Sequence, residues 1–255
     1  MNKIQGVLLD LDGTVYQEDL LIPGAAEAIE ELRRRSFPFR FTTNTTRRPR
    51  TALAAKLRSI GLPADPGEIL SAPAAAARWL HARGARRVQL LLAQATWEEF
   101  SSFEIDDRSP EYVVVGDLGE DWTFPLLNQA FRNLMDGAEL LAIQRNRYWQ
   151  TDGGLSLDAG PFVAALEYGS GKTATLVGKP SPAFFESAAR ELGVPMETIA
   201  VVGDDLESDV AGARLAGMLG VAVRTGKYRP RDEERARREA DVVIDSVAML
   251  PEWLL

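Results

Sequence analysis

Two short apolar runs, one near each end of the chain, are each followed by acidic residues. The first, Ile4 to Leu9, precedes Asp10-Leu11-Asp12-Gly13-Thr14, and the second, Ile199 to Val202, precedes Gly203-Asp204-Asp205. Apolar runs of this length are typical of strands that are buried on both faces of a parallel sheet. If the two strands are neighbours in one sheet, their carboxyl ends meet.

Helical patterns follow the first strand and alternate with further strands. One helix is predicted after Pro23, a second strand covers Phe37 to Thr42, and another helix begins near Pro49 and stops at Gly61. The last third repeats this order, with a helix predicted after Ser181-Pro182. Strands alternating with helices predict an α/β fold with a Rossmann-like parallel sheet.

The middle of the chain has its own set of predicted elements. Strands are expected at Val88 to Leu92, Tyr112 to Gly116 and Leu140 to Ile143, with a helix at about Leu126 to Met135. We interpret this as a smaller α/β domain inserted into the first one. The expected limits are residues 1–77 and 176–255 for the discontinuous core domain and 78–175 for the inserted domain.

Composition excludes several kinds of site. The 255 residues include no cysteine and one histidine, His81, so thiolate zinc sites, cysteine nucleophiles and multi-histidine metal sites are ruled out. The formal net charge of −8 disfavours nucleic acid as a partner. We expect no membrane partner and a cytoplasmic location, because no run is long and apolar enough for a spanning helix or a signal peptide.

The strongest chemical signal is the pair Asp10 and Asp12. In extended geometry, residues two apart point to the same side, which would bring the two carboxylates within about 7 Å at the ligand-binding edge of the sheet. A hard divalent cation such as Mg²⁺ would offset their repulsion. Gly13 permits a tight turn, and Thr14 offers a hydroxyl donor. The alternative is that both acids simply cap the following turn.

The second acidic cluster can complete this site. Asp204 is expected to be a metal ligand alongside Asp10 if the two strands are adjacent. Asp209 lies near the start of a predicted helix at about 208–218, where its role could be supporting or only N-terminal capping. The role of Asp205 stays open at this point.

Two further segments suggest anion binding. Thr43 and Asn44 follow a predicted strand just before a helix, where free N–H groups and short polar side chains bind anions, although ordinary N-capping is an alternative. Lys179 precedes Pro180 and a capped helix, so its ammonium could neutralise a phosphoryl group and the acids around it.

Four segments of this chain resemble, in order, the four motifs of the haloacid dehalogenase-like superfamily. They are Asp10-Leu11-Asp12-Gly13-Thr14, Thr43-Asn44, Gly178-Lys179-Pro180, and Gly203-Asp204-Asp205 with Asp209. The resemblance extends over the whole chain and implies a core with an α/β cap inserted between the second and third motifs. Some relatives in the family carry serine at the position of Asp12. An aspartate there makes this chain look like a phosphoester phosphatase.

The resemblance also implies roles for the residues. Asp10 would attack phosphorus to form an aspartyl-phosphate, and Asp12 would act as general acid and base. Mg²⁺ would be held by the Asp10 side chain, the Asp12 backbone carbonyl and Asp204. Thr43, Asn44 and Lys179 would bind the phosphoryl group, with Asp209, Asp205 and Thr14 as supporting residues.

We therefore expect a Mg²⁺-dependent phosphatase acting on a small phosphorylated substrate, which could be a phosphoester, a phosphoramidate or pyrophosphate. The alternatives are a phosphotransferase or mutase that uses the same aspartyl-phosphate, and a non-enzymatic phospho-acceptor module. Asp12 and the inserted domain disfavour the acceptor module, because a pure acceptor needs neither an acid nor a cap that excludes water. A homodimer is a further expectation from the resemblance.

Overall fold

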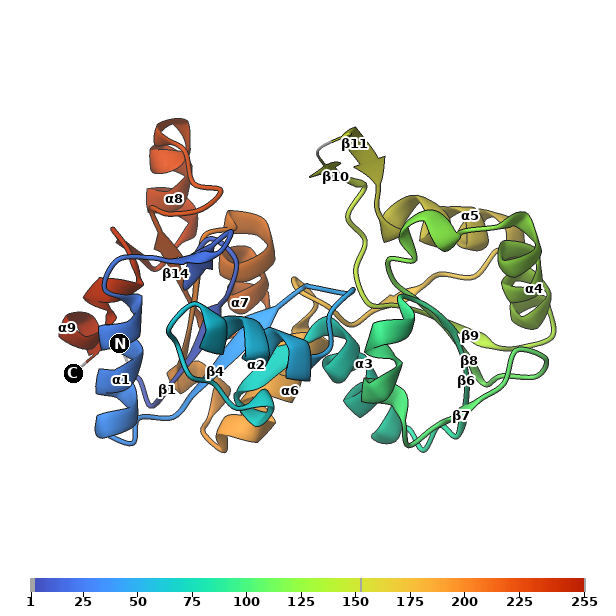
Figure 1. Cartoon of the computed structure of the whole chain (residues 1–255), viewed down its shortest axis with the longest axis horizontal. Helices are drawn as coiled ribbons and strands as arrows, with labels where there is room; N and C mark the ends of the chain where they lie inside the picture. The colour runs from blue at the N-terminus through green and yellow to red at the C-terminus, as the bar shows by residue number, and fades with distance from the viewer. Residues whose placement is uncertain (1–2, 152, 255) are drawn as a thin grey trace. The chain divides into compact units, whose positions relative to one another are not determined.

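The chain forms two compact units, each of the α/β class (Figure 1). The computed structural model describes residues 3–151 and 153–254. The first unit comprises Met1–Thr43, Arg50–Leu70 and Lys179–Leu255, and the second comprises Asn44–Pro49 and Ser71–Gly178. The expected limit at residue 77 would cut helix α3 (Ala72–His81), which belongs entirely to the second unit. The assignment of these units as a core and a cap stays a prediction.

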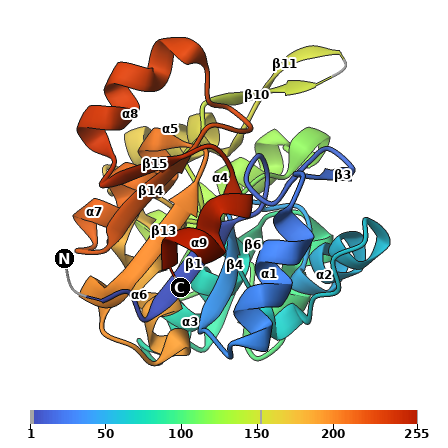
Figure 2. The same ribbon diagram turned by 90° about the vertical axis from the view of Figure 1, so that its left-hand side faces the viewer.

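The first unit is built on a six-stranded sheet, seen face-on in Figure 2. Its strand order is β15 (Val242–Ile244), β14 (Leu219–Val223), β13 (Ile199–Gly203), β1 (Gly6–Asp10), β4 (Phe39–Thr43) and β5 (Ile69–Ser71). The pairings from β15 through to β4 are parallel. The prediction of a Rossmann-like parallel sheet is therefore confirmed, with the two acid-terminated strands β1 and β13 side by side.

Both faces of this sheet are covered, which explains why the two runs that form β1 and β13 are mostly apolar. All five residues of β1 are buried, and Val7 and Leu9 lie in one core cluster with Ile29 of helix α1. The helices of the unit are α1 (Ala25–Arg34), α2 (Arg50–Ser59), α6 (Pro182–Leu192), α7 (Gly212–Leu215), α8 (Glu233–Glu239) and α9 (Leu250–Leu254). A short hairpin joins β2 (Tyr16–Gln17) to β3 (Leu20–Leu21).

The second unit has a parallel sheet of its own. Its order is β12 (Thr175–Leu176), β9 (Glu139–Ala142), β8 (Tyr112–Val115), β6 (Arg87–Leu91) and β7 (Glu104–Ile105). Helices α3, α4 (Phe124–Met135) and α5 (Ala159–Ser170) accompany it, and an antiparallel hairpin joins β10 (Tyr148–Thr151) to β11 (Gly154–Leu157). The three predicted strands and α4 are present, whereas β7 and β12 are too short to give a sequence pattern.

None of the helices in the described residues is both long and apolar enough to cross a membrane.

Candidate active site

The candidate site lies at the carboxyl edge of the first sheet. Asp10 is the last residue of β1 and pairs in register with Thr42 of β4, while Asp204 directly follows β13. Because β13, β1 and β4 are adjacent, these residues come together although the sequence separates them widely. The carboxyl edge of an open parallel sheet is where such folds bind ligands.

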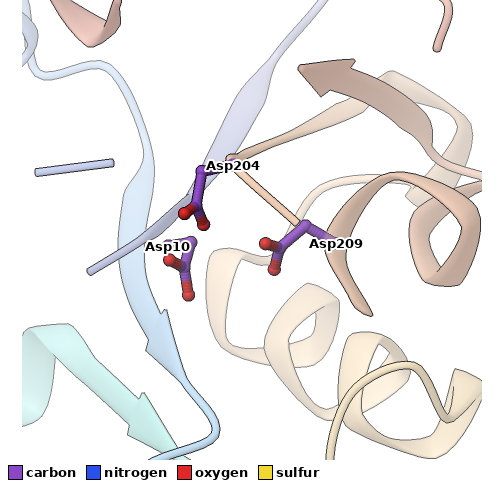
Figure 3. A group of neighbouring side chains, drawn as sticks. All are labelled: Asp10, Asp204 and Asp209. Carbon is purple, nitrogen blue, oxygen red and sulfur yellow. The ribbon is translucent and has the colours of Figure 1, made fainter. Parts of the chain in front are cut away.

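Three carboxylates gather at this edge. Asp10, Asp204 and Asp209 each offer an oxygen atom, and these atoms lie within 4.8 Å of one another (Figure 3). All three residues are buried, with at most 7% of their surface exposed. Asp209 belongs to this cluster, and its expected supporting role stays a prediction.

A π-helical turn brings Asp209 to the cluster. The predicted helix over 208–218 is instead a π-helical turn at Leu206–Ala211, followed by the short helix α7. Gly203 leaves room for the Asp209 side chain, since a Cβ at residue 203 would collide with the Asp209 carboxylate. The sequence pattern could not show this turn because its spacing differs from the α-helical one.

Lys179 is the cation within the cluster. Its Nζ donates hydrogen bonds to Oδ1 of Asp10 at 2.5 Å and to Oδ1 of Asp209 at 2.6 Å, and the residue is 5% exposed. One ammonium among three carboxylates leaves an excess of two negative charges in a buried place. Such an excess is costly unless protons or a cation offset it.

Burial is the main cause of the raised pKa values of the three carboxylates. Burial raises the pKa of Asp10 to about 6 against the opposing effect of Lys179, and burial likewise raises the pKa of Asp204 to about 6. Burial raises the pKa of Asp209 to about 7. Burial alone would lower the pKa of Lys179, but the charges of Asp10 and Asp209 outweigh it and raise this pKa.

These residues fit a hard divalent cation. The cluster presents only carboxylate oxygens, which are the donors that Mg²⁺ and Ca²⁺ prefer, and its charge excess matches one divalent ion. The buried acidic triad can therefore hold a metal ion, displacing the protons that burial would otherwise retain.

Asp12 lies just beyond the end of β1. Strand β1 ends at Asp10, so the extended geometry that would align both carboxylates does not continue, and Asp12 is exposed while Asp10 is buried. Asp12 is near enough for its charge to raise the pKa of Asp10, although burial raises that pKa more. An exposed acid next to a buried one is suited to exchanging protons with a substrate or water.

The two residues after Asp12 form the turn. Gly13 has a φ of 84°, and a Cβ there would collide with the Asp204 carboxylate, so the turn requires glycine. Thr14 is fully buried, and its Oγ1 has no hydrogen-bond partner among the residues that the structure describes.

Asp205 takes the capping role that the sequence left open. Its Oδ1 accepts hydrogen bonds from the backbone N–H groups of Glu207 and Ser208, both at 3.0 Å, at the start of the π-helical turn. Its Oδ2 pairs with Nζ of Lys227 at 2.8 Å. Burial raises the pKa of Asp205, but Lys227 and these hydrogen bonds outweigh it and lower the pKa to about 2.

The predicted phosphoryl-binding pair falls on two different units. Thr43 is buried at the end of β4 in the first unit. Asn44 begins the segment that belongs to the second unit, where its Oδ1 lies against Gly178. A role for either residue in phosphoryl binding stays a prediction.

One segment of the site was not identified from the sequence. Thr225, Gly226 and Lys227 follow β14 and contact both Gly13 and Asp204. None of the four motifs includes these residues, so no role in the site was predicted for them.

Comparison with known protein families identifies the class. Residues 7–106 match the model described as haloacid dehalogenase-like hydrolase, and residues 176–250 match the model described as HAD-hydrolase-like. The human haloacid dehalogenase-like hydrolase domain-containing protein 2 is 43% identical over 232 residues, covering 91% of this chain and 88% of that protein. The chain belongs to the haloacid dehalogenase-like hydrolase family.

Named relatives and solved structures indicate which activity the chain has within this family. The phospholysine phosphohistidine inorganic pyrophosphate phosphatase of Bos taurus is 38% identical over 258 residues, covering 99% of this chain and 94% of that protein. The 4-nitrophenylphosphatase of Thermotoga maritima superposes with a TM-score of 0.90 at 30% identity, covering 99% and 98% of the two chains. The p-nitrophenyl phosphatase of Archaeoglobus fulgidus also gives a TM-score of 0.90, at 29% identity and with 99% and 100% coverage. This chain is thus a phosphatase of the family.

Proposed function

We propose that this chain is a Mg²⁺-dependent phosphatase that hydrolyses a small phosphorylated substrate through an aspartyl-phosphate on Asp10. The observation that carries the proposal is the buried cluster at the sheet edge, where Asp10 contacts Lys179 and lies with Asp204 and Asp209. A carboxylate there can act as a nucleophile while its neighbours offset the charge of the phosphoryl group.

The metal would be held by the side chains of Asp10 and Asp204 together with the backbone carbonyl of Asp12. When bound, Mg²⁺ supplies positive charge that stabilises the phosphoryl oxygens during transfer. Asp209 has a separate task in this proposal, because its contact with Nζ fixes Lys179 beside Asp10.

The chain's own residues account for the bonds that form and break. A carboxylate oxygen of Asp10 bonds to phosphorus as the bond to the leaving group breaks, and Asp12 donates its proton to the departing oxygen or nitrogen. Asp12 then takes a proton from water as the water oxygen attacks phosphorus. That second step releases inorganic phosphate and restores the Asp10 carboxylate.

The phosphoryl oxygens would be bound by Lys179, Thr43 and Asn44. The ammonium of Lys179 already donates to Asp10, so it is placed to neutralise charge on a phosphoryl group attached there. Thr43 and Asn44 supply a hydroxyl and an amide at the end of β4.

The substrate is proposed to be a small phosphoester, phosphoramidate or pyrophosphate. The names of the relatives support this range, since they cover phospholysine, phosphohistidine, pyrophosphate and 4-nitrophenyl phosphate. Asp12 favours esters within that range, because an alkoxide leaving group depends most on a proton donor. Selection among substrates is assigned to the inserted unit, which would serve as the cap.

Release of inorganic phosphate tests the proposal. A panel of 4-nitrophenyl phosphate, small alkyl phosphates, phospholysine and pyrophosphate is incubated with Mg²⁺, and the Asp10→Asn variant controls for contaminating phosphatases. Multiple turnovers that need Mg²⁺ and Asp10 support the proposal. Transfer of the phosphoryl group to a second substrate instead of water would establish the phosphotransferase alternative. Phosphorylation without turnover would establish the acceptor module.

A further inference from the structure

The segment Thr225–Lys227, which follows strand β14, contacts two parts of the site at once. Oγ1 of Thr225 donates a hydrogen bond to the backbone oxygen of Gly13 at 2.5 Å. The backbone N–H of Lys227 donates to Oδ2 of Asp204 at 2.6 Å. This segment therefore joins the loop after β1 to the carboxylate after β13.

Gly226 lies at the closest point of this contact. Its φ is 61°, and a Cβ there would collide with Oδ2 of Asp204 and would lie 2.5 Å from Cα of Gly13. Only a residue without a side chain allows the two backbones to approach so closely. The approach is what lets a main-chain N–H reach the Asp204 carboxylate.

Ion pairs on either side hold the segment in place. Nζ of Lys227 pairs with Asp205, which caps the turn that carries Asp209. On the other side, Arg224 forms two hydrogen bonds with Glu233, at 3.0 and 2.8 Å, and one with Asp245 at 2.7 Å. A segment fixed at both ends can fix the direction of the carboxylate that it contacts.

We propose that Thr225–Lys227 is a positioning segment that orients the Asp204 carboxylate for the divalent cation and holds the Gly13 turn against it. The inference rests on the proposed function, because it assumes that Asp204 is a metal ligand. The N–H of Lys227 occupies Oδ2 and restricts rotation of the carboxylate. Hydrogen bonds of this kind to metal ligands affect metal affinity by about 10-fold to 100-fold.

Isothermal calorimetry of Mg²⁺ with the whole chain tests this role without relying on turnover. Gly226→Ala should weaken Mg²⁺ binding at least about tenfold, because its methyl group displaces the Asp204 carboxylate. Gly217→Ala is the matched control: Gly217 has a similar φ of 78°, but a Cβ there meets nothing within 4 Å. Both variants share the backbone strain, and only the first disturbs the carboxylate.

A second variant covers the case in which Gly226→Ala does not fold. Thr225→Val removes the hydrogen bond to Gly13 with little change in volume and should weaken Mg²⁺ binding several-fold, whereas Thr225→Ser should bind as wild type does. Wild-type affinity in Thr225→Val, and in Gly226→Ala where it folds, would overturn the positioning role and leave the metal site standing. A wild-type chain that binds no Mg²⁺ would overturn the metal site itself and the positioning role with it.

Discussion

The two units carry the same kind of parallel sheet, and acidic residues follow strands in both, but their carboxylates are bonded differently. In the second unit, Asp117 follows β8 and accepts a hydrogen bond from the N–H of Gly119 at 2.7 Å. Asp158 accepts from the N–H of Ala159 at 2.7 Å and from the side-chain amide of Gln144. Asp158 is thus bonded to neutral donors, whereas Oδ2 of Asp117 also pairs with Nη1 of Arg47 at 3.8 Å.

The first unit places three buried carboxylates within reach of one another, which the second unit's two acids do not match in the described residues. Asp10 and Asp209 share one ammonium group, and Asp204 has a backbone donor from Lys227 but lies among the other carboxylates. Topology alone therefore does not make a site, since Asp117 follows β8 of the second parallel sheet and Asp158 follows β11 of the separate hairpin. What distinguishes the first edge is the buried charge that the described residues leave uncompensated.

The largest expected difference between the two sets of acids is catalytic. Asp10→Asn should leave the fold intact and lower the rate of phosphate release from 4-nitrophenyl phosphate by about 10⁴-fold or more, because an amide does not attack phosphorus. Circular dichroism verifies the fold of the variant. Activity within tenfold of wild type would remove Asp10 as the nucleophile.

A second difference should appear in the metal requirement. EDTA should abolish turnover and Mg²⁺ should restore it, and Asp204→Ala should raise the Mg²⁺ concentration for half-maximal rate by about 100-fold or more. Titration of the initial rate with Mg²⁺ measures this shift. Undiminished turnover in EDTA would contradict the assignment of the triad to a metal.

Within the site, the exposed acid Asp12 should affect substrates differently according to their leaving groups. Asp12→Asn should slow hydrolysis of an alkyl phosphate by about 10²-fold to 10⁴-fold, and of 4-nitrophenyl phosphate much less, because nitrophenolate leaves without a proton. The ratio of kcat values for the two substrates is the measurement. Equal losses on both would show that Asp12 is not the proton donor.

The smallest effect is expected at the acids of the second unit. Burial raises the pKa of Asp158, so a neutral amide suits its position, and the Asn oxygen can still accept the capping hydrogen bond. Asp158→Asn should change the free energy of unfolding by about 1 kcal/mol or less and leave Mg²⁺ affinity as in wild type. Denaturant unfolding and calorimetry check both, and a large loss of Mg²⁺ affinity would mean that the two sets of acids are not independent.

Much of the first sheet could be predicted from sequence because its signals are local. The apolar runs of β1 and β13 identify buried strands, and parallel topology then brings Asp10 and Asp204 to one edge. The resemblance included Asp209 among the supporting residues, but the turn that carries it could not be predicted, since it is π-helical and depends on the space that Gly203 leaves.

Contacts between segments that are distant in the sequence could not be predicted either. The hydrogen bond from Lys227 to Asp204 is donated by a backbone N–H. Every residue type except proline has this group, so the residue type at position 227 does not indicate the contact. The exposure of Asp12 could not be predicted, because β1 ends at Asp10 and a turn at Gly13 follows, which a two-residue periodicity does not detect.

The central claim is that Asp10 itself receives the phosphoryl group, and trapping the intermediate tests it most directly. The enzyme is mixed with excess substrate and Mg²⁺, quenched in acid within the first turnovers, digested, and analysed by tandem mass spectrometry. We expect a phosphoryl group on Asp10, removed by hydroxylamine and lacking in Asp10→Asn. Full turnover by wild type with no phosphoryl group on Asp10, or with the group on another residue, would contradict the account.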